Sequence, residues 1–183
     1  MTRPRAAIGR KILRREDYHS GTDETVYELK AFRSEFRYRV PPSFAFHWLT
    51  DFEEGKGLYR LMSQTGPLRV RVHEEARMVE RLGWKPVTRF TVRLTGPLTW
   101  TRTIELYDTH GKLQGHSLVE EELQESESGT LHHLGTTVTA RTSLFRIVYV
   151  LGGRRSMIQS LDEQYQDVKK RMESDFRRST SPK

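Results

Sequence analysis

Three polar residues stand where predicted strands otherwise place apolar side chains, and they could carry chemistry: Arg102, Glu121 and His132. Each is an even number of residues from apolar neighbours on its own strand. These neighbours are Trp100, Ile104 and Leu106 for Arg102, Val119 and Leu123 for Glu121, and Leu134, Val138 and Ala140 for His132. Strand side chains alternate between two faces, so each polar residue points inward if its neighbours do. A buried charge needs a partner or a ligand. Arg102 could therefore pair with Glu121 or anchor a ligand carboxylate or hydroxyl. Alternatively, strand ends or bulges could turn these residues outward.

The histidine and glutamate residues of this region also raise the question of a metal site. His132 and His133 are adjacent, and residues 120–122 are three consecutive glutamates. Neighbouring strand residues point to opposite faces, so the two histidines cannot bind one buried ion. The sequence predicts neither a metal nor a cofactor. It has no P-loop, no G-x-G-x-x-G and no local serine–histidine–acid arrangement, which is only weak evidence against an enzyme because such an arrangement can assemble in space. We expect a noncatalytic protein, with an enzyme as the alternative.

Large side chains supply the other candidate ligand contacts. Ligand pockets have mostly apolar walls with a few directed polar groups. The candidates with an aromatic ring or a thioether are Trp48, Trp84, Phe90, Trp100, Met157 and Tyr165. The same side chains could instead fill a core. As a set we expect them to do both, because few other large side chains are available to a wrapped sheet.

Alternating apolar and polar residues predict the strands that must position these groups. A strand at 36–40 ends at Pro41-Pro42, and helical spacing then predicts two short helices, near 43–51 and 58–62. Further alternating runs predict strands at 68–72, 78–84, 90–94, 100–106, 113–124 and 131–141. The turns between them are short, which indicates an antiparallel meander.

The period changes to that of a helix near the C-terminus. One apolar stripe follows spacings of three and four residues: Met157, Leu161, Tyr165, Val168, Met172 and Phe176. Upstream, residues 144–151 are nearly all apolar and end at Gly152-Gly153, where we expect a kink or break. The predicted fold is α+β, with a curved antiparallel sheet wrapped around a long C-terminal helix and two short helices after the first strand.

This layout resembles the helix-grip superfamily of START-like or SRPBCC proteins, in particular the polyketide cyclase/dehydrase group. The stretch 36–51, FRYRVPPSFAFHWLTD, is similar to the family's opening, in which a strand runs through proline into a helix ending near aspartate. The hairpins between about 68 and 141 resemble its sheet, and 154–178 resembles its closing helix. The resemblance implies a cavity between sheet and helix for a lipid or polyketide-like molecule. The family has no universal catalytic motif, so no catalytic residue carries over.

Charge is concentrated at the ends of the chain. The net charge is +7, yet residues 1–15 and 169–183 each hold six basic residues, with no acid in the first segment and two in the second, so the body is mildly acidic. We predict a flexible basic arm at 1–24, a single domain at 25–178 and a tail at 179–183. Basic ends can contact anionic lipid or nucleic acid nonspecifically, although solvated tails are the simpler interpretation.

Composition indicates a soluble, cytoplasmic protein. The 183 residues include no cysteine, and the sequence has no apolar run long enough to span a membrane and no secretory signal. Three hypotheses follow. The first is binding or transport of a small hydrophobic ligand. The second is a cyclase/dehydrase-type enzyme acting on such a ligand. The third is docking on a membrane or nucleic acid through the basic termini.

Overall fold

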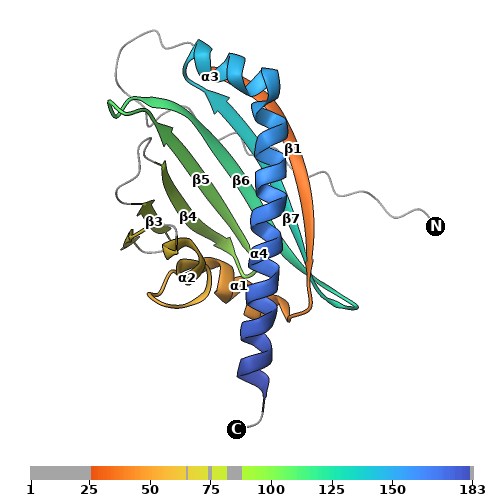
Figure 1. The fold of residues 1–183 in the computed structure, drawn as a ribbon. Helices are drawn as coiled ribbons and strands as arrows, with labels where there is room; N and C mark the ends of the chain where they lie inside the picture. The colour runs from red at the N-terminus through yellow and green to blue at the C-terminus, as the bar shows by residue number, and fades with distance from the viewer. Residues whose placement is uncertain (1–25, 65, 74–75, 82–87, 182–183) are drawn as a thin grey trace, which may run out of the picture.

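The computed structural model describes residues 26–64, 66–73, 76–81 and 88–181. It confirms the predicted fold class: seven antiparallel strands form one curved sheet, with two short helices after the first strand and a long helix at the end (Figure 1). The elements, in chain order, are β1 Tyr27–Tyr38, α1 Pro42–Thr50, α2 Gly57–Ser63, β2 Leu68–His73, β3 Ala76–Arg81, β4 Thr88–Gly96, β5 Thr99–Tyr107, β6 Leu113–Ser126, β7 Gly129–Ala140, α3 Ser143–Val148, the π-helical turn η1 Tyr149–Gly153 and α4 Arg154–Thr180.

The sheet is a meander closed by its first strand. Its order is β1-β7-β6-β5-β4-β3-β2, so β1 crosses over to pair with β7 while β2 to β7 follow one another. Burial along β7 alternates at every residue, as a strand with one covered face requires. The threonine and valine residues of β7 suit this pleated, half-buried surface.

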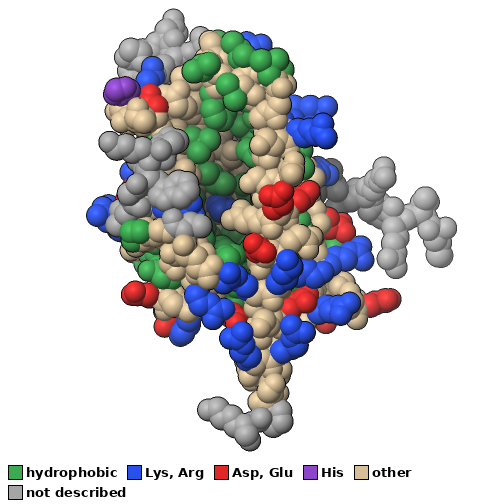
Figure 2. Space-filling model, in the orientation of Figure 1, with side chains coloured by type: hydrophobic (Ala, Val, Ile, Leu, Met, Phe, Trp, Pro, Cys, Tyr) green, Lys and Arg blue, Asp and Glu red, His purple; other side chains and the backbone are tan. Residues whose placement is uncertain are grey.

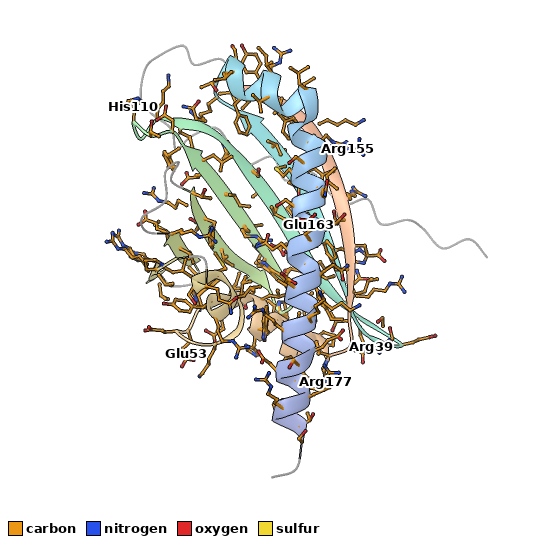
Figure 3. All side chains as sticks on the ribbon, viewed as in Figure 1. Arg39, Glu53, His110, Arg155, Glu163 and Arg177 are labelled. Atoms are coloured by element: carbon orange, nitrogen blue, oxygen red, sulfur yellow. The ribbon has the colours of Figure 1, made fainter. Side chains whose placement is uncertain are left out.

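Helix α4 covers the concave face of the sheet. Its buried residues Tyr165, Val168 and Met172 belong to the predicted apolar stripe and join the main core with residues of β1, β5, β6 and β7. Charged and polar side chains line its outer face (Figure 2), where Arg155, Glu163 and Arg177 are exposed (Figure 3). No helix among the described residues is long and apolar enough to cross a bilayer.

The apolar segment before α4 bends at the predicted glycines. α3 continues into the π-helical turn η1, and Gly152 inside that turn has φ 155° and ψ −15°. This is a backbone region that side-chain-bearing residues avoid. A kink at Gly152-Gly153, predicted from the sequence, is therefore confirmed.

Several element ends differ from the sequence predictions. β1 begins at Tyr27 rather than near residue 36, because its first half is paired to β7 although its alternation is weak. α4 continues to Thr180, two residues beyond its predicted end, whereas residues 82–84 of the predicted strand 78–84 lie outside the described residues. The predicted arm at 1–24 and the candidate Trp84 lie outside the described residues.

Candidate functional site

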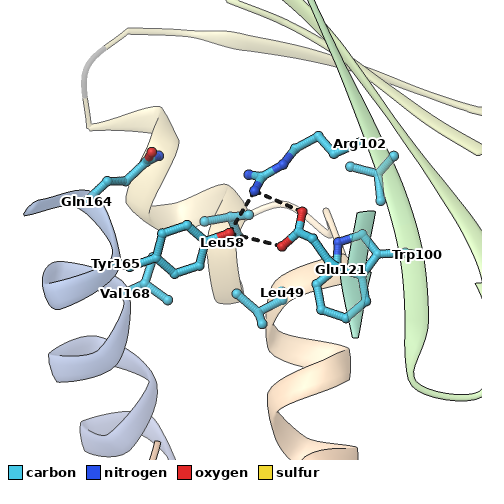
Figure 4. Close-up of a pocket in the computed structure, with 9 residues that line it drawn as sticks. Leu49, Leu58, Trp100, Arg102, Glu121, Gln164, Tyr165 and Val168 are labelled. Atoms are coloured by element: carbon cyan, nitrogen blue, oxygen red, sulfur yellow. Dashed lines mark hydrogen bonds and ion pairs between the residues drawn. The ribbon is translucent and has the colours of Figure 1, made fainter. Parts of the chain in front are cut away.

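A network of buried polar side chains lies between the sheet and α4. Arg102 on β5 and Glu121 on β6 approach to 2.9 Å between Nη2 and Oε1. The hydroxyl of Tyr165 on α4 accepts from Arg102 Nη2 at 2.7 Å and donates to Glu121 Oε2 at 2.9 Å (Figure 4). The predicted inward orientation of Arg102 and Glu121 is confirmed, and one helix residue joins them.

The sheet register explains why Arg102 and Glu121 meet. Glu121 lies opposite Trp100 on β5, and Arg102 lies opposite Val119 on β6. Arg102 and Glu121 are therefore diagonal neighbours on the same face, within reach of long side chains. The side chain of Glu121 is 1% exposed and that of Arg102 is 13% exposed, so their ion pair is shielded from water.

Arg102 and Glu121 each stabilise the charged form of the other. Burial alone would raise the pKa of Glu121, but the Arg102 guanidinium and the contacts from His132 and Tyr165 outweigh it and lower the pKa. Burial opposes the charge of Arg102, yet Glu121 and Tyr165 raise its pKa. Burial raises the pKa of Tyr165. At neutral pH Glu121 and Arg102 are charged and Tyr165 is a neutral phenol.

His132 extends the network to β1. Its Nε2 lies 3.0 Å from Glu121 Oε2, and its Nδ1 lies 2.9 Å from the hydroxyl of Tyr38. Because the Glu121 carboxylate only accepts, Nε2 carries the proton and Nδ1 accepts from Tyr38. Burial lowers the pKa of His132. The ring is therefore a neutral bridge between Tyr38 and Glu121.

Two hollows adjoin the network. The inner one, about 10 Å³, is lined by Leu49, Leu58, Val92, Trp100, Arg102, Glu121, Gln164, Tyr165 and Val168 (Figure 4). That volume holds roughly one water molecule. The outer hollow, about 190 Å³, is lined by Met62, Arg81, Thr88, Phe90, Arg102, Ile104 and Gln164. Arg102 and Gln164 line both. The visible face is hollowed beside α4 (Figure 2).

The structure separates the other candidate residues. Trp100 lines the inner hollow and Phe90 the outer one. Trp48 is buried, but its indole N–H donates to Asp175 at 3.0 Å, and it lines a different hollow near the ends of α1 and α4. Met157 packs against a second apolar cluster that includes Phe32 and Tyr149. The sequence pattern does not reveal these differences, since all four residues are large and apolar.

Two residues of this region escape sequence reasoning. The alternation of β1 indicates that Tyr38 faces inward, but nothing in the sequence indicates that its hydroxyl meets His132. Gln164 precedes Tyr165 on the polar face of α4 and lies at the rim of both hollows. Its position next to an inward-facing residue of the helix stripe is the one sequence signal that could have identified it.

The network has little capacity for acid–base chemistry. Both oxygens of Glu121 and both ring nitrogens of His132 face protein partners, and His132 is 0% exposed. The adjoining inner hollow has space for water but not for a substrate. A general base must reach the proton that it abstracts, and in this structure neither side chain reaches the outer hollow.

Metal ligands do not gather here. Within the described ranges, no group of three or more histidine, cysteine, aspartate or glutamate side chains could hold a metal ion. His133, next to His132, lies on the other face of β7, where Nδ1 is 3.6 Å from Glu35 Oε2. The two histidines face opposite sides of the sheet, as the alternation predicts.

Comparison with known proteins shows the fold. No family model matches the chain, and no curated protein matches it. Among solved structures, a protein of unknown function from Staphylococcus aureus aligns with TM-score 0.57 and 11% identity over 83% of this chain and 98% of that one. Ara h 8.0201, which has the helix-grip fold, aligns with TM-score 0.55 and 12% identity over 82% and 97%. An uncharacterised protein from Rhizobium leguminosarum aligns with TM-score 0.55 and 10% identity over 82% and 97%. The chain therefore has a helix-grip-like fold.

Proposed function

We propose that the protein binds a small, mainly apolar ligand in the outer hollow, with Arg102 as the polar anchor. The observation that carries the proposal is the state of the Arg102 guanidinium. Its Nη2 serves Glu121 and Tyr165, whereas its Nε is buried with no hydrogen-bond partner among the described residues. A buried donor without a partner is uncommon in native proteins and calls for an acceptor.

The shape and lining of the hollow define the ligand class. Met62, Phe90 and Ile104 supply apolar walls, and Arg102 and Gln164 supply donors. Desolvation of apolar surface would provide most of the affinity, and the donors would orient a carboxylate, carbonyl or hydroxyl. The volume of about 190 Å³ is below the roughly 300–1,000 Å³ of ordinary ligand pockets. The ligand is therefore small, or part of it extends into solvent.

The interactions of Glu121 and Tyr165 with Arg102 support binding rather than turnover. They fix the position and charge of the guanidinium before a ligand arrives, which lowers the ordering cost of binding. A cyclase or dehydrase would need an acid or base facing its substrate, and His132 and Glu121 face other protein groups instead. A carrier with a preorganised anchor is the function that the geometry favours.

Native mass spectrometry of the protein purified from its own host tests this proposal. We expect a stoichiometric adduct that denaturing extraction identifies as a small molecule with an apolar body and an acceptor group. Ile104→Trp, which fills the outer hollow and leaves every residue of the network unchanged, should abolish the adduct. Thr103→Trp is the matched control, because Thr103 lies on the opposite face of the same strand.

The variants also define the results that would overturn the proposal. An adduct that survives in Ile104→Trp would place the ligand elsewhere. If the wild-type protein carries no adduct and no carboxylic acid, alcohol or ketone from an apolar panel raises its melting temperature, the carrier function is wrong. Equal melting temperatures for both tryptophan variants, without ligand, establish that they are folded.

A further inference from the structure

The α3–η1 segment exposes a continuous apolar stripe. Leu144, Ile147, Val148 and Leu151 follow the i, i+3, i+4, i+7 spacing of one helix face, and Val150 adjoins them. All five side chains are exposed, to 69% for Leu144 and 81% for Leu151. Figure 2 shows hydrophobic side chains gathered at this end of the molecule. We call these five residues the apical patch.

The fold does not need the apical patch for its own packing. The opposite side of the same segment already contacts the sheet: Phe145 and Tyr149 pack against the cluster around Phe32 and Val138, and the Tyr149 hydroxyl donates to the Lys30 carbonyl at 3.0 Å. The segment is therefore apolar on two sides, and only one is covered by the described chain. Exposed patches of this kind mark interaction surfaces.

The segment that carries the apical patch holds charged side chains of one sign. Residues 141–161 contain four arginines, Arg141, Arg146, Arg154 and Arg155, and no acidic residue. Arg146 belongs to the same segment, and its guanidinium lies 4.7 Å from the centre of the Tyr27 ring. Arg155 projects from the first turn of α4, next to α3 (Figure 3). An apolar stripe bordered by arginines is the pattern of an interfacial membrane anchor.

We propose that the apical patch docks the protein on an anionic lipid bilayer. The aliphatic side chains enter the boundary between headgroups and acyl chains, and the arginines contact lipid phosphates. The turn at Gly152 favours this mode because it interrupts the helix and leaves Val150 and Leu151, on the bend, mostly in solvent. The membrane is contacted, not spanned. This docking does not depend on the ligand proposed above.

Charge complementarity distinguishes the bilayer from a second copy of the chain. A symmetric pair of chains would place the same patch on both sides of the interface and bring like charges together. An anionic lipid surface satisfies both the apolar stripe and the arginines.

Flotation of the full chain with vesicles tests the proposal. The vesicles are phosphatidylcholine alone or a two-to-one mixture of phosphatidylcholine and phosphatidylglycerol. We expect binding to the mixed vesicles. The double variant Leu144→Ser/Leu151→Ser should reduce the partition coefficient at least about tenfold, because two buried leucines are removed from the interface. Val72→Ser is the control, since Val72 is 62% exposed on β2, away from the patch.

Salt dependence and sedimentation distinguish docking by the apical patch from vesicle binding by the termini and from dimerisation. Arg155→Gln should weaken binding to mixed vesicles, and added salt should weaken it in the wild type.

Unchanged binding by the double leucine variant would overturn the proposal and assign vesicle binding to the basic termini. A concentration-dependent dimer in sedimentation that the double variant abolishes would assign the patch to a second copy. No wild-type binding to mixed vesicles would also overturn it. The melting temperature shows that each variant is folded.

Discussion

The hydroxyl of Tyr165 on α4 donates to Oε2 of Glu121 on β6 across 2.9 Å, and so ties the C-terminal helix to the centre of the sheet. The Tyr165 ring also stacks on Phe36 of β1, with centroids 4.4 Å apart and planes 10° apart. One side chain therefore packs against an edge strand and completes a buried polar network. Loss of its hydroxyl alone should therefore lower the free energy of unfolding by a measurable amount.

Tyr165→Phe should destabilise the fold while leaving its packing intact. The substitution keeps the stacked ring but leaves Arg102 and Glu121 each without one partner. Hydrogen bonds to charged groups contribute about 1.5–3 kcal/mol, and we expect a decrease of this size in the free energy of unfolding, measured with urea. Tyr59→Phe is the matched control, because the Tyr59 hydroxyl makes no hydrogen bond among the described residues. Equal effects of the two changes would contradict the role assigned to the Tyr165 hydroxyl.

The Arg102–Glu121 ion pair should show strong coupling in a double-mutant cycle. Arg102→Met leaves Glu121 buried without its counter-charge, and removal of one partner of a buried pair costs roughly 3–5 kcal/mol. The double variant Arg102→Met/Glu121→Leu should lose less than the sum of the two single variants, because it leaves no unpaired charge. Additive losses, measured by urea unfolding, would show that the ion pair is not formed.

Acid should weaken the fold, beginning below about pH 6.5. Burial lowers the pKa of His132 from its ordinary value of 6.5. As pH falls below that value, the unfolded chain binds a proton that the folded chain resists, so stability is lost on acidification. The lowered pKa of Glu121, whose ordinary value is 4.5, extends the loss in the same direction to lower pH. Urea midpoints between pH 8 and pH 4 measure both effects.

A histidine substitution separates the His132 contribution. Burial also lowers the pKa of His116, so the comparison is made in a His116→Gln background. There, His132→Gln should flatten the pH dependence between about 6.5 and 5. Tyr38, Tyr165 and Arg102, which surround His132, all have raised pKa values and do not titrate in this range. If His132→Gln leaves the slope of stability against pH unchanged, His132 is not the neutral ring between Tyr38 and Glu121 that the structure describes.

Gly152→Ala should destabilise the protein through its backbone alone. A Cβ at Gly152 meets no atom within 4 Å, but φ is 155°, and such conformations cost side-chain-bearing residues about 1–3 kcal/mol. Gly135→Ala on β7 is the control, since its Cβ would only touch Glu120 Oε2 at 4.0 Å and its φ is ordinary. Equal melting temperatures for the two variants would mean that the turn at Gly152 is absent in solution.

Sequence patterns determined where most helices and strands of this protein lie and which side of each is buried. Alternation identified the inward parity of Arg102, Glu121 and His132, and the 3.6-residue period identified Tyr165 as a core residue of the long helix. These predictions succeed because strand and helix geometry fix side-chain direction locally. Prediction failed where the local pattern is weak. The first half of β1 shows little alternation, and only its pairing with β7 makes it a strand.

Tertiary structure alone decided which of these inward residues meet. The register between β5 and β6 places Arg102 diagonally across from Glu121, and the path of α4 over the sheet brings Tyr165 between them. The same packing leaves about 10 Å³ beside the network and about 190 Å³ at its outer side. It also separates Met157 and Trp48 from both hollows. Local sequence sets side-chain direction along one strand or helix, whereas distances between elements depend on register and packing over the whole fold.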